Sequence, residues 1–305
     1  MVNMINKKSN IFDDGIAFVE QWDFSKANLN EENRINAITQ VASICYQNPK
    51  ALNSDSLYNR LMAESMGLPS SSFEFVPVLF NYRWISDYFY TFSDMSLEIS
   101  NTLKYGEMLD ICGVEYLLTN FRALVYDVEN IGLCKDILKH FNTEEECEII
   151  AKYFKVFLYK IDFPTRSQMV RHRVNWQELS RRYVSGKRVP FDFYISEKMK
   201  GLESDHEDYF QHGMSDFETE FVNTHSTEKL IEMCVEHYYQ ALEKGVKPQE
   251  ARRIIPQAAY TQIWGAFQPT QYENFMKLRD DEVHAQWEIA QVAKAMRELT
   301  QSETV

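Results

Sequence analysis

The sequence is poor in glycine, with ten glycines in 305 residues. Neither G-x-G-x-x-G nor G-x-x-x-x-G-K-[ST] occurs, which argues against a dinucleotide-binding βαβ unit and against a P-loop. A phosphate ligand would therefore have to be held mainly by side chains, through charge-assisted hydrogen bonds.

Cysteine is also sparse and shows no pattern. The five cysteines are scattered without a C-x-x-C pair, and the seven histidines never form H-E-x-x-H. This usage predicts reduced, mostly buried thiols and no metal site. The first fifteen residues contain neither the apolar core nor the cleavage site of a secretory signal, so we expect a cytoplasmic protein.

Positive charge and long apolar runs are both scarce. Lys and Arg number 32 against 45 Asp and Glu, for a net charge of −13. This balance argues against general nucleic-acid binding, which needs a basic footprint. No apolar run approaches the roughly 18 residues that span a bilayer, so we expect no membrane segment. The 45% hydrophobic content is ample for a folded core.

Hydrophobic periodicity predicts an α+β fold in which helices flank a modest mixed or antiparallel sheet. We predict helices over residues 30–46, 54–66, 142–154, 226–245, 247–255 and 282–299, and strands over 70–84 and 155–164. Residues 113–128 fit either a strand or a buried helix, and 94–109 are ambiguous. The polar, acidic segment 197–220 is predicted to be an exposed excursion.

The scarce positive charge is concentrated in one stretch. Six Arg or Lys and one His lie between Arg171 and Arg188, with Glu178 as the single acid. Gln168 and Arg171 share a helix face. Together with Ser180, these residue types are suited to holding a phosphate. The alternative is a solvated basic face that pairs with the acidic excursion, and both interpretations remain open.

A second stretch, residues 250–296, places Arg252, Arg253 and Arg279 among apolar neighbours. An arginine in such surroundings needs an anionic or carbonyl partner. That partner could be a ligand, or an internal acid such as Glu282 or Glu288.

Together the two stretches resemble the flavin-dependent thymidylate synthase family. The first carries Arg171-His172-Arg173, then Glu178-x-Ser180-x-Arg182-Tyr183. The second carries Ala251-Arg252, Pro256, Tyr260-Thr261, Asn274-Phe275, Leu278-Arg279 and His284-Ala285-Gln286-x-Glu288-Ile289. The resemblance covers roughly residues 156–296.

The resemblance implies an enzyme that makes dTMP from dUMP. Methylenetetrahydrofolate would donate the one-carbon unit, NADPH would reduce a bound FAD, and the sites would lie at subunit interfaces of a homotetramer. It also implies one domain over residues 1–305, in which residues 77–153 are an insertion atypical of the family.

By the same resemblance, individual residues are assigned to two ligands. The predicted flavin contacts are Arg171, His172, Arg173, Glu178, Asn274 and His284. The predicted nucleotide contacts are Gln168, Ser180, Arg181, Arg182, Arg252 and Arg279. Arg279 is implied to be catalytic, because its guanidinium would stabilise negative charge on the uracil ring as carbon 5 becomes nucleophilic.

The sequence departs from the family pattern in four places. Six residues instead of seven separate Arg173 from Ser180, and Arg181 stands where a small residue is common. Gln268-Pro269-Thr270 replaces an Asn-x-Arg, and the glutamate that precedes the motif could be Glu74 or Glu115. Two alternatives therefore stay open: a related flavin- and folate-dependent methylase or hydroxymethylase of another pyrimidine nucleotide, and a nucleotide- or flavin-binding protein without turnover.

Overall fold

The computed structural model describes residues 5–25, 29–48, 50, 52, 54–62, 69–210 and 219–301, with side chains described except at 5–6, 205–210 and 219–223. The chain divides into two compact units. Unit 1 comprises Met1–Ile161, Thr165–Ser180 and Thr261–Val305, and unit 2 comprises Asp162–Pro164 and Arg181–Tyr260. Each unit is described by itself below.

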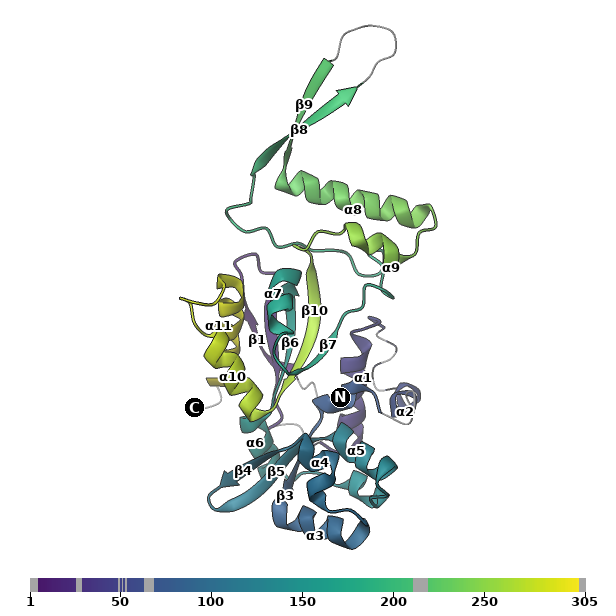
Figure 1. Cartoon of the computed structure of the whole chain (residues 1–305), viewed down its shortest axis with the longest axis vertical. Helices are drawn as coiled ribbons and strands as arrows, with labels where there is room; N and C mark the ends of the chain where they lie inside the picture. Colours follow the sequence, from purple (N-terminus) through teal and green to yellow (C-terminus); the bar gives the residue numbers. More distant parts are fainter. Residues whose placement is uncertain are drawn as a thin grey trace. The chain divides into compact units, whose positions relative to one another are not determined.

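A five-stranded sheet forms the centre of unit 1 (Figure 1). Its order is β1-β2-β6-β10-β7. The strands are β1 (Ile5–Asn10), β2 (Phe18–Trp22), β6 (Lys155–Asp162), β10 (Tyr260–Phe267) and β7 (Asn175–Glu178). The β1–β2, β2–β6 and β10–β7 pairs are antiparallel. Seven of the eight β10 residues are buried, as expected for an interior strand.

Helices at both ends of the chain cover this sheet. Helix α11 (Trp287–Gln301) packs against β1 and β2 through a buried apolar stripe, and α10 (Pro269–Arg279) packs against α11. Helix α1 (Glu31–Ser43) begins at the N-cap Asn30, whose side chain accepts a hydrogen bond from the Asn33 amide. Helix α7 (Phe163–Met169) follows β6 directly and leads into the Arg171 motif.

A second, three-stranded antiparallel sheet of unit 1 has the order β3-β5-β4. Its strands are β3 (Pro77–Asn81), β5 (Val114–Asn120) and β4 (Glu107–Ile111). The elements around it are α2 (Asp55–Met62), η2 (Ser71–Phe75), α3 (Tyr82–Phe92), η3 (Leu97–Ile99), α4 (Asn101–Lys104), α5 (Phe121–Asn130), η4 (Lys135–Lys139) and α6 (Glu144–Tyr153). One hydrophobic cluster joins both sheets of unit 1, for example through Trp22, Trp264, Val78 and Leu117.

Unit 2 contains a hairpin and a helical layer. Strands β8 (Glu203–Phe210) and β9 (Thr219–Ser226) pair antiparallel. Helix α8 (Thr227–Glu243) follows β9, and the short helices α9 (Pro248–Ala251) and η5 (Arg252–Ile254) follow α8. Gly245 adopts φ +84° just beyond α8, a conformation that favours glycine and ends the helix.

The predicted α+β class is confirmed, and the differences lie in individual elements. Residues 113–128 are both predicted alternatives in turn, first β5 and then α5. The predicted strand 70–84 is confined to β3, which is an edge strand with Pro77 at its first position. The predicted helix 54–66 ends at Met62, and residues 63–66 lie outside the described residues.

Several strands were not predicted. The segment predicted as an exposed excursion over 197–220 is exposed at residues 197–204, and it also contains β8 and the start of β9, because the backbone hydrogen bonds of a hairpin do not require an apolar period. The buried strand β10 was not predicted, because its run of apolar residues lacks the alternation by which a half-buried strand is recognised.

Candidate functional site

The first motif and the second meet at a contact between His172 and Arg279. Helix α7 ends at Met169, whose carbonyl accepts a hydrogen bond from the His172 amide at 3.1 Å. Arg279 is the last residue of α10, and its Nε donates to His172 Nε2 at 2.8 Å. The His172 ring also lies edge-on to Phe275, with 4.8 Å between the ring centroids. A turn and a helix end, about a hundred residues apart in sequence, thus fix one guanidinium.

Arg279, which contacts His172, also feels the positive charge of a second arginine, Arg171. Burial and the neighbouring Arg279 lower the pKa of His172, which favours the neutral ring that can accept a hydrogen bond at Nε2. Burial and the charge of Arg171 lower the pKa of Arg279. Among the described residues, no carboxylate pairs with either arginine. A guanidinium that has no carboxylate partner can bind an anion by charge-assisted hydrogen bonds.

The sheet beside this contact is held by Glu178 on β7. Glu178 Oε2 accepts from Arg166 Nε of α7 at 3.0 Å, and Oε1 accepts from Thr261 Oγ1 of β10 at 3.2 Å. The carboxylate therefore links one helix and two strands. The sequence assigns Glu178 to the flavin, and in the structure both of its oxygens have partners within the protein.

The other predicted residues of unit 1 surround this framework. Gln168 on α7 donates to the Gln286 side chain, and the Ser180 amide donates to the Cys45 carbonyl at 3.4 Å. His284 Nδ1 lies 2.8 Å from Asp281 Oδ2, and this contact lowers the pKa of Asp281. Arg173 and Asn274 are exposed. Neither has a hydrogen-bond or ion-pair partner among the described residues.

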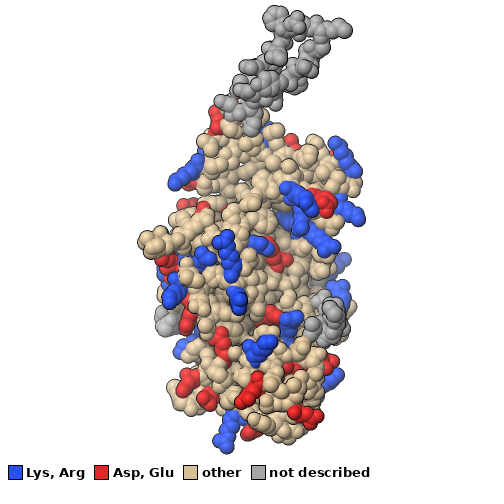
Figure 2. Space-filling model, viewed as in Figure 1, with Lys and Arg blue, Asp and Glu red and all other residues tan. Residues whose placement is uncertain are grey.

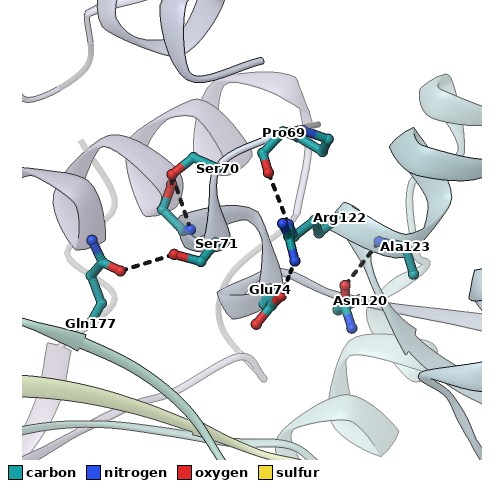
Figure 3. Close-up of polar contacts among 9 residues, drawn as sticks. Pro69, Ser70, Ser71, Glu74, Asn120, Arg122, Ala123 and Gln177 are labelled. Carbon is teal, nitrogen blue, oxygen red and sulfur yellow. Dashed lines mark hydrogen bonds and ion pairs between the residues drawn. The ribbon is translucent and has the colours of Figure 1, made fainter. Parts of the chain in front are cut away.

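The two glutamates that the sequence left open lie in different elements of unit 1. Ser71, in η2, donates to the side chain of Gln177 on β7 at 3.1 Å, and η2 also contains Glu74 (Figure 3). Glu115 lies instead on β5, in the three-stranded sheet. Glu74 is paired with Arg122 at 2.6 Å, and burial raises its pKa against the opposing effect of that arginine. The segment of Glu74 is therefore the one that contacts the motif strand.

Arg181, Arg182 and Arg252 belong to unit 2. Arg181 is buried, and its guanidinium donates to the carbonyls of Val189 and Pro190 and lies 4.3 Å from the centroid of the Phe191 ring. The sequence places this arginine beside the nucleotide, whereas its contacts close its own loop, and burial lowers its pKa. Arg182 and Arg252 are exposed.

The sequence motifs include Thr261 but not Arg166, and neither residue was predicted to contact Glu178. Arg166 and Thr261 bind Glu178 across 12 and 83 positions of sequence, and helical or strand periodicity does not connect such positions. Only the order of β6, β10 and β7 in the sheet brings them together.

The remaining expectations concern metals, membranes and overall charge. Within the described residues, no group of three or more His, Cys, Asp or Glu could hold a metal ion, and no helix is long and apolar enough to cross a membrane. On the face shown in Figure 2, basic and acidic side chains are interspersed.

These observations define a class of protein: an α+β protein in which the family-motif residues His172 and Arg279 meet in unit 1, close to the ends of α7 and α10. The pattern of the Thy1 family, described as thymidylate synthase complementing protein, matches residues 128–304, more than half of the chain. The chain belongs to this family.

Curated relatives agree with this assignment. A flavin-dependent thymidylate synthase of Thermosipho africanus is 31% identical over 150 residues, covering 45% of this chain and 60% of the relative. The enzyme of the same name from Thermotoga neapolitana is 29% identical over 204 residues, covering 64% and 84%. A third, from Aquifex aeolicus, is 30% identical over 148 residues, covering 48% and 45%. The chain thus spans about three fifths of the length of the first of these relatives.

Proposed function

We propose that this protein is a flavin-dependent thymidylate synthase, which converts dUMP to dTMP with methylenetetrahydrofolate as the one-carbon donor and NADPH as the reductant of FAD. Membership of the Thy1 family supports the reaction class. The observation that carries the proposal is the Arg171–His172–Arg279 arrangement, because the family motifs meet there and leave two cations without a carboxylate among the described residues.

The residues present fit an anionic cofactor and substrate. Exposed or half-buried cations and amides suit phosphate groups. The proposed flavin contacts are Arg171, His172, Arg173, Asn274 and His284. The proposed nucleotide contacts are Gln168, Ser180, Arg182, Arg252 and Arg279. We leave Glu178 and Arg181 out of both sets, because their side chains already have protein partners. When bound, the flavin supplies redox chemistry and carries the one-carbon unit.

In this proposal Arg279 is the catalytic residue and His172 positions it. The neutral His172 ring accepts from Arg279 Nε, so the two terminal nitrogens of the guanidinium remain available for a ligand. A fixed cation aimed at a uracil carbonyl stabilises the negative charge that develops when carbon 5 becomes nucleophilic. Because α10 and α7 hold both partners in place, this cation needs little reorganisation during the reaction.

We also propose that the protein acts as a cytoplasmic homotetramer. The absence of a membrane-spanning helix in the described part of the chain is compatible with this, and the family resemblance is its main support. Sedimentation velocity of the purified protein with and without FAD tests the assembly. A protein that stays monomeric with FAD bound contradicts it.

The central experiment combines a flavin spectrum with substrate discrimination. We expect the purified protein to take up FAD, to lose the oxidised flavin absorbance with NADPH, and to release tritium from carbon 5 of dUMP when methylenetetrahydrofolate is present. Tritium release from dCMP or UMP, but not from dUMP, would replace the proposal with a related pyrimidine nucleotide methylase or hydroxymethylase. Failure to bind FAD would leave a protein without this turnover.

A further inference from the structure

Unit 1 contains a cavity of about 450 Å³ between α1, α2, η4 and the first residue of α5. Among the described residues, none of those assigned above to the flavin or the nucleotide lines it, and neither does any residue of α7, β7, β10 or α10. Five of its nine wall residues come from the predicted insertion 77–153. The volume falls within the range of small-molecule sites, roughly 300–1,000 Å³. We refer to it as the insertion cavity.

The wall contains a buried arginine whose charge meets no acid. Arg34 on α1 is 2% exposed, and its terminal nitrogens donate to the carbonyls of Leu138, at 3.0 Å, and His140. Its Nε is buried without a hydrogen-bond partner, and no carboxylate pairs with it among the described residues. Burial lowers the pKa of Arg34 to about 10, so the side chain stays charged at neutral pH. Because neutral carbonyls do not cancel a buried charge, the cavity attracts an anion.

Tyr58 on α2 provides a neutral donor beside this charge. Its ring lies 5.5 Å from that of Phe73, between centroids, and its hydroxyl has no hydrogen-bond partner among the described residues. Burial raises the pKa of Tyr58 to about 12 against the opposing effect of Arg34, so the hydroxyl keeps its proton at neutral pH. A protonated phenol donates well to a carboxylate oxygen. The wall thus combines a free donor with a positive charge.

The other charged wall residues make the cavity more positive. Lys135 and Lys139 are exposed cations, and each pairs with an exposed acid outside the wall, at 3.7 and 2.7 Å. Solvent screens pairs of this kind. Glu31 is the single acid of the described wall, and it forms no ion pair with Arg34. Three positive wall charges against one negative charge favour a monoanion over a cation.

The rest of the wall is apolar. The ring centroids of Phe121 and Phe141 each lie 4.8 Å from Cζ of Arg34, a distance at which aromatic faces stabilise a guanidinium. Met62 and Leu138 complete the apolar surface. A ligand that fills this cavity therefore needs an apolar body as well as a negative end.

We propose that the insertion cavity binds a small organic carboxylate with an aromatic or branched apolar body. The carboxylate accepts a hydrogen bond from Tyr58 and lies in the positive potential of Arg34, while the body packs against Phe121 and Phe141. The insertion thereby adds a second ligand site to the family domain. This proposal does not depend on the thymidylate synthase reaction, since it concerns binding at separate residues.

Tyr58→Phe is the decisive variant, because it removes one hydroxyl without a partner among the described residues and keeps the ring contact with Phe73. Tyr153→Phe is the matched control. Tyr153 is also half-buried and packs against the same hydrophobic cluster, and it does not line the cavity. Arg34 itself is left intact, because its two hydrogen bonds to backbone carbonyls support the fold.

Ligand-observed NMR titration of the full chain with phenylacetate, 3-phenylpropanoate and 4-methylpentanoate tests the proposal, and the three corresponding amides test the charge. We expect saturable binding of at least one carboxylate, with a Kd about tenfold higher in Tyr58→Phe and unchanged in Tyr153→Phe. The amide of that carboxylate should bind at least about tenfold more weakly. Absence of binding by all three carboxylates, equal affinity for the amide, or an unchanged Kd in Tyr58→Phe overturns the proposal.

Competition with dUMP separates this site from the proposed active site. Carboxylate binding should persist with saturating dUMP and in Arg279→Ala. If either abolishes it while Tyr58→Phe does not, the ligand occupies the arginine site and the cavity proposal is wrong. Loss of dUMP turnover alone bears only on the proposed function.

Discussion

Arg279 of unit 1 is an arginine of the family pattern, whereas Arg181 of unit 2 stands where that pattern commonly has a small residue, and the two differ in how their guanidinium groups are satisfied. Arg181 donates to two backbone carbonyls and stacks on Phe191, so its charge is used inside its own loop. Arg279 gives one hydrogen bond to a neutral histidine and lies near a second arginine. The number of internal partners therefore separates an arginine that builds structure from one that is free for a ligand.

The largest expected effect on activity comes from replacing Arg279, the arginine with few partners inside the protein. Arg279→Ala should lower the rate of tritium release from dUMP by about 10²–10³-fold, as expected when one charge-stabilising donor is removed. The thermal midpoint should change little, because the lost contact is a single hydrogen bond on a half-buried side chain. Near-normal turnover in this variant would show that the comparison misassigns Arg279.

Arg181→Met should show the opposite profile. Two backbone carbonyls lose their donors, and removal of a buried charge offsets part of that cost, so we expect the free energy of unfolding to fall by about 1–3 kcal/mol. Urea denaturation measures the change, with Arg182→Ala at the exposed neighbour as the control. A stable Arg181→Met protein with weakened dUMP binding would instead support Arg181 as a contact of the nucleotide.

The His172–Arg279 contact should make turnover depend on pH. The pKa of His172 is lowered from its ordinary value of 6.5, so in the folded protein the ring stays neutral to a lower pH than in the unfolded chain. As pH falls through that lowered pKa, the ring becomes protonated, Nε2 stops accepting, and a third positive charge joins Arg171 and Arg279. Because Arg279 then loses the acceptor that positions it, the turnover of dUMP and the stability should both fall on the acid side and be retained above pH 6.5.

His172→Gln isolates this effect, because glutamine offers an acceptor oxygen that does not titrate. We expect the variant to keep part of the activity and to lose the acid limb of the kcat/KM profile that His172 causes. His284, which contacts Asp281, serves as the comparison through His284→Gln. If the acid limb of the kcat/KM profile persists unchanged in His172→Gln, a titrating group other than His172 causes it.

The sequence predicted the parts of this comparison that depend on local patterns. The helix predicted over residues 30–46 and the two arginine motifs could be recognised from neighbouring residues. The contact between His172 and Arg279 could be expected only from family resemblance, since the two lie 107 positions apart.

Other features could not be predicted, because they depend on which groups the fold leaves without partners. Arg181 and Arg182 are adjacent cations in the sequence, yet one is buried against carbonyls and the other is exposed. Hydrogen-bond satisfaction is a property of the packed chain, so only the structure reveals it.

The smallest expected effect on stability comes from replacing Arg253. Its neighbour Arg252 allows a paired and an unpaired arginine to be compared at adjacent positions. Arg253 forms an exposed i, i+3 ion pair with Glu250 at 3.2 Å, whereas its neighbour Arg252 has no partner among the described residues. Arg253→Ala should change the free energy of unfolding by less than about 0.5 kcal/mol, because solvent screens such pairs. It should leave dUMP affinity unchanged, while Arg252→Ala weakens it. Equal losses in both variants would mean that a surface ion pair does not withdraw an arginine from ligand binding, and that partner number alone cannot identify the site.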